Sequence, residues 1–136
     1  MVREIVKDVE FLSKPSSDCS FPSRELFEDL RDTLLSHKGT CLGLAANMSG
    51  VRKRGLALFI EDSVKVMFNP VIVSSSDPYD TEEGCLSLEG ERKTKRFEFI
   101  QLLYFDWKGR EKFSTFSSLE AEVIQHEIDH MNGIII

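Results

Sequence analysis

The sequence has little of what characterises secreted or membrane proteins. Its three cysteines, Cys19, Cys41 and Cys85, are widely spaced and form no Cys-x-x-Cys pair, so the disulfide scaffold of a secreted domain is excluded. Nowhere do about eighteen apolar residues follow one another, which excludes a helix that spans a membrane. The N-terminus lacks the apolar core of a signal peptide. We therefore expect a cytoplasmic protein that does not associate with membranes.

Charge and length set further limits on the chain. Basic residues number 17 and acidic residues 23, and the net charge of −6 argues against a dedicated nucleic-acid binder. The basic runs at residues 52–54 and 92–96 could touch ribosomal RNA, but such runs are more often solvated loops. Because the 136 residues contain no visible repeat or low-complexity tract, the sequence predicts one domain over residues 1–136.

Hydrophobic periodicity predicts an α+β fold. Runs of helical period occur near both ends of the chain, and the middle consists of short apolar runs separated by turn residues. The expected elements are a helix at 24–37, strands at 55–60, 64–68 and 71–73, a polar loop at 74–78, a hairpin of strands 97–106 and 111–116, and a last helix. Ser117 and Glu120 have the spacing of a capping box that starts this last helix. Short antiparallel or mixed strands around a C-terminal helix are therefore expected.

The C-terminal helix carries the most informative motif, His126-Glu127-Ile128-Asp129-His130. Histidines at positions i and i+4 lie on one face of a helix, so both rings can bind one metal ion. Glu127 is then placed to act as a general base toward a water at the metal. Only three histidines occur in the chain, so a chance pairing on a surface helix is a poor explanation. The motif predicts a catalytic metal site.

A catalytic metal site of this kind usually has a third protein ligand and an open position for water. Cys85 lies in a Gly-containing turn, where a thiolate can point toward a neighbouring helix, and it is the favoured candidate. Cys41 is the alternative, although it precedes an apolar turn where a free cysteine is often simply buried. His37 at the end of the first helix and Cys19 in a polar segment are weaker candidates.

The residues around these ligands resemble those of peptide deformylase. Residues 83–87, Glu-Gly-Cys-Leu-Ser, match one motif of that family. Residues 125–130 match its Gln-His-Glu-x-Asp-His motif, in the same order and at about the same separation. Its first motif, Gly-x-Gly-Leu-Ala-Ala-x-Gln-x-Gly, is matched in part by residues 41–50. The resemblance covers nearly the whole chain and implies the peptide-deformylase fold.

The resemblance also implies an activity. Deformylases are metal-dependent hydrolases that remove the formyl group from the N-terminal formyl-methionine of nascent proteins. By the family pattern Cys85, His126 and His130 hold one divalent metal ion, usually Fe²⁺, with Zn²⁺, Ni²⁺ or Co²⁺ as substitutes. Glu127 takes a proton from water and passes it to the leaving nitrogen. The implied partners are an N-formyl-methionyl peptide and the ribosome.

The same resemblance implies contacts to the substrate. The backbone N–H of Leu86 is expected to donate to the developing oxyanion, together with the glutamine of the first motif. The substrate backbone should pair near Gly43 as an added strand, with Leu42 beside the methionine side chain. Arg92 matches an arginine that the family often keeps near the substrate.

Two positions depart from the family pattern. Met48 replaces the motif glutamine, and a thioether cannot donate a hydrogen bond to an oxyanion. Asn47 carries an amide, but its neighbouring position should direct that amide elsewhere. Glu122 lies one helical turn before His126, where the family commonly has an apolar residue lining the methionine pocket. A carboxylate there would disfavour an apolar side chain unless Arg92 or Lys93 paired with it; otherwise that face is wet and Glu122 is merely solvated.

Two functions therefore compete. The first is a deformylase with reduced or altered specificity, favoured by the complete ligand set and by Glu127. The second is a catalytically weak or silent paralogue that binds metal or formyl peptide, favoured by Met48 and Glu122. A metal-stabilised structural protein is less attractive because it leaves Glu127 without a role.

Overall fold

Helices and a five-stranded sheet form the structure, a computed structural model in which residues 1–85 and 87–135 are described. The helical elements are α1 (Val9–Leu12), α2 (Arg24–Ser36), the 3-10 helix η1 (Ala46–Ser49) and α3 (Ser118–Met131). The strands are β1 (Gly43–Ala45), β2 (Gly55–Ile60), β3 (Ser63–Cys85), β4 (Leu88–Phe105) and β5 (Glu111–Ser117). The sheet order is β1-β2-β3-β4-β5, and each neighbouring pair is antiparallel. The expected α+β class is confirmed.

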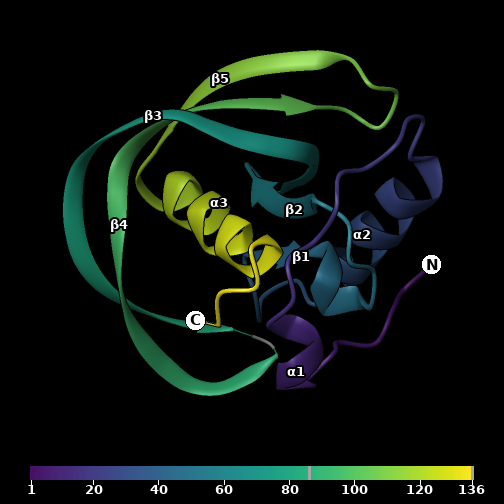
Figure 1. Cartoon of the computed structure of the whole chain (residues 1–136), viewed down its shortest axis with the longest axis horizontal. Coiled ribbons are helices and arrows are strands. Elements are labelled where there is room, and N and C mark those ends of the chain that lie inside the picture. Colours follow the sequence, from purple (N-terminus) through teal and green to yellow (C-terminus); the bar gives the residue numbers. More distant parts are fainter. Residues whose placement is uncertain (86, 136) are drawn as a thin grey trace.

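β3 and β4 are much longer than the sequence predicts. β3 has 23 residues and β4 has 18, so the expected loop at 74–78 lies inside β3 and the expected short strand at 71–73 is part of it. The prediction of a loop was wrong because the backbone groups of this polar stretch pair with β4. A side-chain contact adds to this pairing: the Ser74 hydroxyl donates to Gln101 Oε1 at 2.6 Å. Figure 1 shows the two strands sweeping as a curved ribbon around α3. This ribbon carries residues 79–85 to the helix.

The two long helices cover opposite faces of the sheet. Leu30 and Leu34 of α2 belong to one buried cluster, which includes Ala57 of β2. Ile124 of α3 belongs to a second cluster, which includes Leu56 of β2. Because successive side chains of a strand point to opposite faces, β2 separates the two clusters and is buried on both sides. Burial of the apolar side chains of α3 against this face of the sheet fixes the position of the helix.

The start of α3 differs in detail from the capping-box prediction. Ser117 is the N-cap residue, as expected, but its side chain makes no capping hydrogen bond. The neighbouring Ser118 instead donates its hydroxyl to Glu98 Oε1 of β4 at 2.8 Å. Further along α3, the Gln125 amide accepts from the Phe97 N–H and donates to the Phe97 carbonyl, both at 2.8 Å. Side chains of α3 therefore tie the helix to β4.

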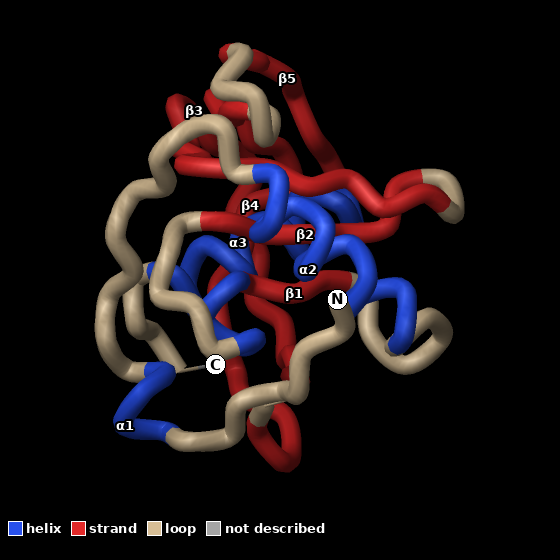
Figure 2. Tube along the Cα trace, turned by 90° about the vertical axis from the view of Figure 1, so that its right-hand side faces the viewer, coloured by secondary structure: helices blue, strands red, loops and turns tan. Residues whose placement is uncertain are grey.

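The segment that follows α3 returns to the N-terminal region. The Ser16 N–H donates to the Met131 carbonyl at 2.7 Å, and Gly133 has a φ of +76° where a Cβ would overlap the Ser13 carbonyl. Figure 2 shows the C-terminal end on the same side as α1.

Among the described residues, no helix is both long and apolar enough to cross a membrane.

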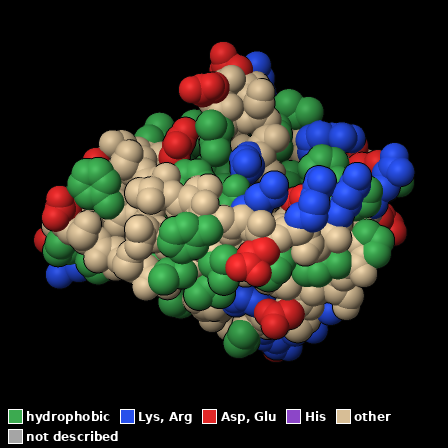
Figure 3. All heavy atoms as spheres, turned by 90° about the horizontal axis from the view of Figure 1, so that it is seen from above, with side chains coloured by type: hydrophobic (Ala, Val, Ile, Leu, Met, Phe, Trp, Pro, Cys, Tyr) green, Lys and Arg blue, Asp and Glu red, His purple; other side chains and the backbone are tan. Residues whose placement is uncertain are grey.

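Some side chains of the two basic runs contact other parts of the protein. Arg96 is buried, and Arg54 donates to the Asn132 side chain at 2.9 Å. Elsewhere, lysine and arginine side chains gather at one end of the surface drawn in Figure 3. The run at 92–96 is therefore not the solvated loop that its composition suggests.

Candidate metal centre and active-site pocket

His126 and His130 lie on one face of α3, as their spacing predicts. Both side chains are buried, and their Nε2 atoms approach to 3.0 Å. Burial and the neighbouring His126 lower the pKa of His130 to about 3, so this ring is neutral and keeps a lone pair free. Two nitrogens bound to one tetrahedral metal at about 2.0–2.1 Å would lie about 3.4 Å apart. The spacing of the rings fits a shared metal ion with little adjustment.

Cys85 completes the group from the end of β3. Its Sγ and one nitrogen of each histidine all lie within 4.8 Å of one another. The alternative, Cys41, lines the same cavity but is not a member of this group. Burial raises the pKa of Cys41 to about 11, which disfavours the thiolate that metals bind. The structure thus favours Cys85 over Cys41 as the third donor.

A buried ion-pair network stands behind His126, and sequence reasoning missed it. Glu83 Oε1 lies 2.7 Å from His126 Nδ1, so this carboxylate orients the ring and leaves Nε2 to face His130. Arg96 donates to Glu83 through Nε and Nη2 and to Asp129 Oδ2 through Nη1 at 2.6 Å. Burial by itself would raise the pKa of Glu83, but the hydrogen bonds from His126 and Arg96 outweigh it and lower that pKa to about 2. The network holds a charged carboxylate beside the site.

Glu127 points into the cavity next to the first strand. Its side chain is buried, and its Oε1 has no hydrogen-bond partner among the described residues. A Cβ on Gly43 would lie 2.5 Å from Val123 Cγ1 and 2.9 Å from Glu127 Oε2, so only glycine fits there without displacing these side chains of α3. Burial raises the pKa of Glu127 to about 7. A carboxylate with this pKa can both accept and return a proton near neutral pH.

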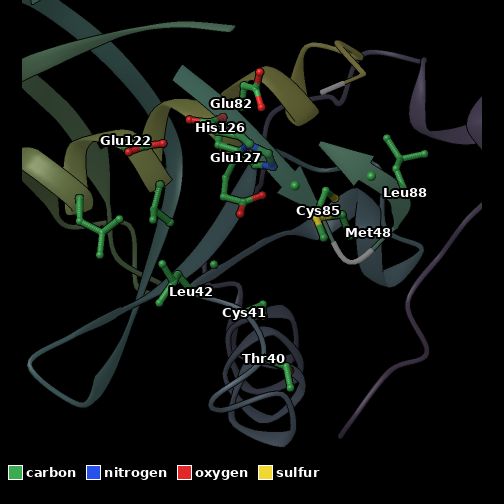
Figure 4. A pocket seen from close by; sticks show the side chains of 16 residues that line it. Thr40, Cys41, Leu42, Met48, Glu82, Cys85, Leu88, Glu122, His126 and Glu127 are labelled. Atoms are coloured by element: carbon green, nitrogen blue, oxygen red, sulfur yellow. Dashed lines mark hydrogen bonds and ion pairs between the residues drawn. The ribbon is translucent and has the colours of Figure 1, made fainter. Parts of the chain in front are cut away.

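Four residues of the site line a cavity of about 560 Å³: Glu83, Cys85, His126 and Glu127. Figure 4 shows Cys85, His126 and Glu127 together with the Leu42, Met48 and Glu122 side chains around it. Of the substrate-contact candidates, Leu42 and Gly43 line the cavity. Arg92 is not among the lining residues; in the register of the β3–β4 pair its backbone lies opposite Glu83. Leu86 falls outside the described residues.

Met48 and Asn47 point in different directions. Met48 lines the cavity, and its sulfur accepts a weak hydrogen bond from the Ala45 N–H at 3.4 Å. The Asn47 amide donates to the His130 carbonyl at 2.9 Å and is buried. Asn47 therefore does not supply the donor that the motif glutamine would bring, in agreement with the expectation that it points elsewhere.

Glu122 lines the cavity, as the helical period predicts, but it pairs with neither of the two basic residues suggested for it. No ion pair joins it to Arg92 or Lys93 in the described part of the chain. Instead the Tyr79 hydroxyl donates to Glu122 Oε1 at 3.4 Å. Burial, and then the nearby Glu83, raise the pKa of the Glu122 carboxyl. The sequence could not signal this contact because Tyr79 belongs to a stretch with no strand periodicity.

Known proteins share both the sequence and the fold. A peptide deformylase of Clostridium beijerinckii is 46% identical over 136 residues, which cover 100% of both chains. A peptide deformylase of Thermoanaerobacter pseudethanolicus is 32% identical over 124 residues, 90% of this chain and 77% of that protein. Among solved structures, a class I type b peptide deformylase from Acinetobacter baumannii with bound Met-Ala-Ser is 27% identical, with a TM-score of 0.88 over 99% of this chain and 96% of that one. The peptide deformylase of Thermotoga maritima is 26% identical, with a TM-score of 0.89 over 99% of this chain and 95% of that one.

These likenesses extend over the segments that build the metal centre. Residues 2–136 match the family model described as polypeptide deformylase. The match includes the cysteine at the end of β3 and the two histidines of α3. The chain belongs to the polypeptide deformylase family.

Proposed function

We propose that this chain is an active deformylase that hydrolyses the N-terminal formyl group of formyl-methionyl peptides, releasing formate and a free amine. One observation carries the proposal: Glu127, a buried carboxylate with an unpartnered oxygen, faces the same cavity as a convergent Cys-His-His group. That combination is suited to hydrolysis at a metal and has no purpose in a purely structural site. Family membership over residues 2–136 supports the same function.

Cys85, His126 and His130 would hold one divalent metal ion. One cysteine sulfur and two imidazole nitrogens form a ligand set that suits a transition metal, and we propose ferrous iron, with zinc, nickel or cobalt as substitutes. Such an ion, when bound, polarises the formyl oxygen and lowers the pKa of a coordinated water. Glu83 keeps the His126 ring in place by accepting from its Nδ1–H. A thiolate ligand also makes a ferrous site sensitive to oxidation.

Glu127 supplies the proton transfers. Its carboxylate accepts the proton of the attacking water, and the resulting acid returns that proton to the nitrogen of the departing amine. The pKa of about 7 suits both steps, because neither protonation state is strongly favoured at neutral pH. The close approach of Gly43 to Oε2 places the base beside β1, an edge strand of the sheet. A peptide paired with this edge would bring its N-terminal group to the base.

Stabilisation of the oxyanion is the weak part of the site. Met48 lies where the family motif has a glutamine, and its sulfur cannot donate a hydrogen bond. The Asn47 amide donates to the His130 carbonyl and is not available to the oxyanion. The proposed remaining protein donor is the backbone N–H of Leu86. Loss of one such donor typically lowers the rate by roughly 10²–10³.

The test is formate release from formyl-Met-Ala-Ser by protein purified anaerobically with ferrous iron or with nickel. Wild type should release formate, and Glu127→Ala should abolish release while metal content by elemental analysis stays the same. Met48→Gln should raise the rate by restoring a donor. Metal-loaded wild type that releases no more formate than Glu127→Ala would refute the function for this substrate.

A second candidate function is a silent paralogue that binds metal or peptide without turnover. Met48 is the observation in its favour. The identity of 46% over the whole chain to a peptide deformylase supports the active enzyme instead. A large gain in Met48→Gln from a negligible wild-type rate would support the silent form. Contact with the ribosome stays a prediction from the sequence.

A further inference from the structure

The two histidines of the candidate metal centre are held in different ways. The ring of His126 is oriented by Glu83, whose Oε1 lies 2.7 Å from its Nδ1. The ring of His130 faces His126 through Nε2, and its buried Nδ1 has no hydrogen-bond partner among residues 1–85 and 87–135. A metal-binding histidine usually donates its second ring nitrogen to a partner that fixes the ring. Within the described residues, the place of the His130 ring therefore depends on packing and on its backbone.

The backbone of His130 is anchored by a residue from the first half of the chain. Its carbonyl accepts from the Asn47 side-chain amide at 2.9 Å and from the Gly133 N–H at 3.0 Å. Carbonyls in the last turn of a helix have no partner within the helix, so donors from outside determine how they are held. Gly133 belongs to the turn that ends α3, whereas Asn47 lies 83 residues before His130, on η1. Asn47 thus ties this peptide group to a separate element.

The 3-10 helix that carries Asn47 is itself held firmly. All four of its residues are buried. The Val6 N–H donates to the Met48 carbonyl at 2.7 Å, and the Ser49 hydroxyl donates to the Ala46 carbonyl at 2.7 Å. A side chain on such an element can hold a neighbouring group at a defined place, as the support of a metal ligand requires.

Asn47 is not the side chain that stability alone would favour at this position. It is 1% exposed, and its Oδ1 has no hydrogen-bond partner among the described residues. A buried acceptor without a partner destabilises a fold, and an apolar side chain of the same shape avoids that cost. The contribution of Asn47 therefore lies in its N–H donors, and their acceptor in the described structure is the His130 carbonyl.

We propose that Asn47 is a positioning residue for the metal centre. Its amide fixes the peptide group of His130, and with it the place of the His130 ring beside Cys85 and His126. Asn47 thereby does for His130, through the backbone, what Glu83 does for His126 through the ring. Without this contact, metal binding would have to order the His130 ligand at additional entropic cost. The inference rests on one part of the proposed function, a metal held by Cys85, His126 and His130.

The experiment measures the zinc affinity of the metal-free protein by competition with a chromophoric chelator, which needs no turnover. Asn47→Leu keeps the shape of the side chain and removes both N–H donors. Its dissociation constant for zinc should rise about 10- to 100-fold, the usual effect of losing a contact behind a metal ligand. The visible absorption bands of bound cobalt(II), which report ligand geometry, should shift as well. Asn47→Ala, which removes the same donors but leaves space, should show both effects.

Ser49 provides a matched control on η1. Ser49→Ala removes a buried side-chain hydrogen bond that ends at the Ala46 carbonyl and does not reach α3. Its dissociation constant should stay within about threefold of wild type, below the range for contacts behind a ligand. Urea unfolding of the metal-free variants shows whether affinity only follows stability. If Asn47→Leu binds zinc within threefold of wild type, or if both variants lose affinity in proportion to lost stability, the proposal is overturned.

A measurement on wild type serves if the Asn47 variants do not fold. Zinc binding should shift the NMR resonances of the Asn47 side-chain amide, because this amide bonds to the peptide group of a ligand. The side-chain amide of Asn69, which donates to the Cys19 carbonyl at 3.2 Å, is the internal control and should not respond. An Asn47 amide that responds no more than that of Asn69 would overturn the proposal.

These readouts separate the inference from the proposed function. If wild type binds zinc but releases no formate with any metal, and Asn47→Leu weakens zinc binding, the proposed function fails while the assignment of Asn47 stands. If wild type releases formate and Asn47→Leu binds zinc as wild type does, the assignment fails and the proposed function stands.

Discussion

Replacement of Arg96 by methionine should destabilise the metal-free protein strongly. Arg96 is 3% exposed and donates to both oxygens of Glu83 and to Asp129. Methionine fills much of the same space but leaves the Glu83 carboxylate, 7% exposed, with His126 as its remaining side-chain donor among these contacts. Removing one partner of a buried ion pair typically costs about 3–5 kcal/mol. That is a large share of the roughly 5–15 kcal/mol by which domains are stable.

The assay is urea unfolding followed by far-UV circular dichroism in the presence of EDTA, so that metal binding does not add to the free energy. With a slope of about 1.5 kcal/mol per molar urea, the expected loss moves the midpoint by about 2–3 M. Lys95→Met is the matched control, because Lys95 precedes Arg96 on β4 and is exposed. Its unfolding free energy should change by no more than about 0.5 kcal/mol.

A double-mutant cycle decides whether the effect comes from the ion pair. Glu83→Gln combined with Arg96→Met removes both charges, so the combined loss should be smaller than the sum of the two single losses by more than about 0.5 kcal/mol. Additive losses, or a loss below about 1 kcal/mol in Arg96→Met, would refute the reasoning. In that case burial and packing, rather than the network, would account for the position of these side chains.

Three further predictions follow from close contacts and burial. Gly43→Ala should lower kcat by at least tenfold, because the added Cβ would lie 2.5 Å from Val123 Cγ1 and 2.9 Å from Glu127 Oε2 on α3; unchanged formate release would show that the base tolerates displacement of these side chains. Gly133→Ala should lower the free energy of unfolding by about 1–3 kcal/mol, since the added Cβ meets the Ser13 carbonyl at a φ of +76°, and an unchanged urea midpoint would contradict this. Burial raises the pKa of Cys19 to about 11 from an ordinary value of 9.0, so its contribution to stability is complete below pH 9 and is lost as the pH rises toward 11. Cys19→Ala should therefore show a shallower alkaline loss of stability in reducing buffer than wild type, and equal slopes would count against the buried thiol.

The residues of the candidate metal centre could be predicted largely from local sequence. His126 and His130 are brought together by helix geometry alone, so their spacing carries the information. Cys85 lies 41 residues earlier, and it ends strand β3 instead of lying in the turn that the neighbouring glycine suggested. Its motif was the informative signal, and the structure brings its sulfur to the histidines. The resemblance to deformylases then assigned roles that geometry alone leaves open.

The network around Arg96 could not be predicted in the same way. Its partners Glu83 and Asp129 lie 13 and 33 residues away, and in sequence Arg96 belongs to a basic run with the composition of a solvated loop. Pairing between β3 and β4 decides that this side chain is buried. The polar composition of residues 74–78 hid the strand that makes this pairing, and the same error hid the contact of Tyr79 with Glu122.

The curved ribbon of β3 and β4 is joined to α3 by two closures of different kinds. A metal bound by Cys85 and His126 would cross-link positions 41 residues apart, and Arg96 links β4 to Asp129 across 33 residues. The chain segments that these two contacts close, 85–126 and 96–129, overlap. Forming one contact therefore lowers the entropic cost of forming the other. A chelator would remove the first closure and leave the second. We therefore expect the ribbon to stay docked on the helix in the metal-free protein, with Cys85 still close to the histidines.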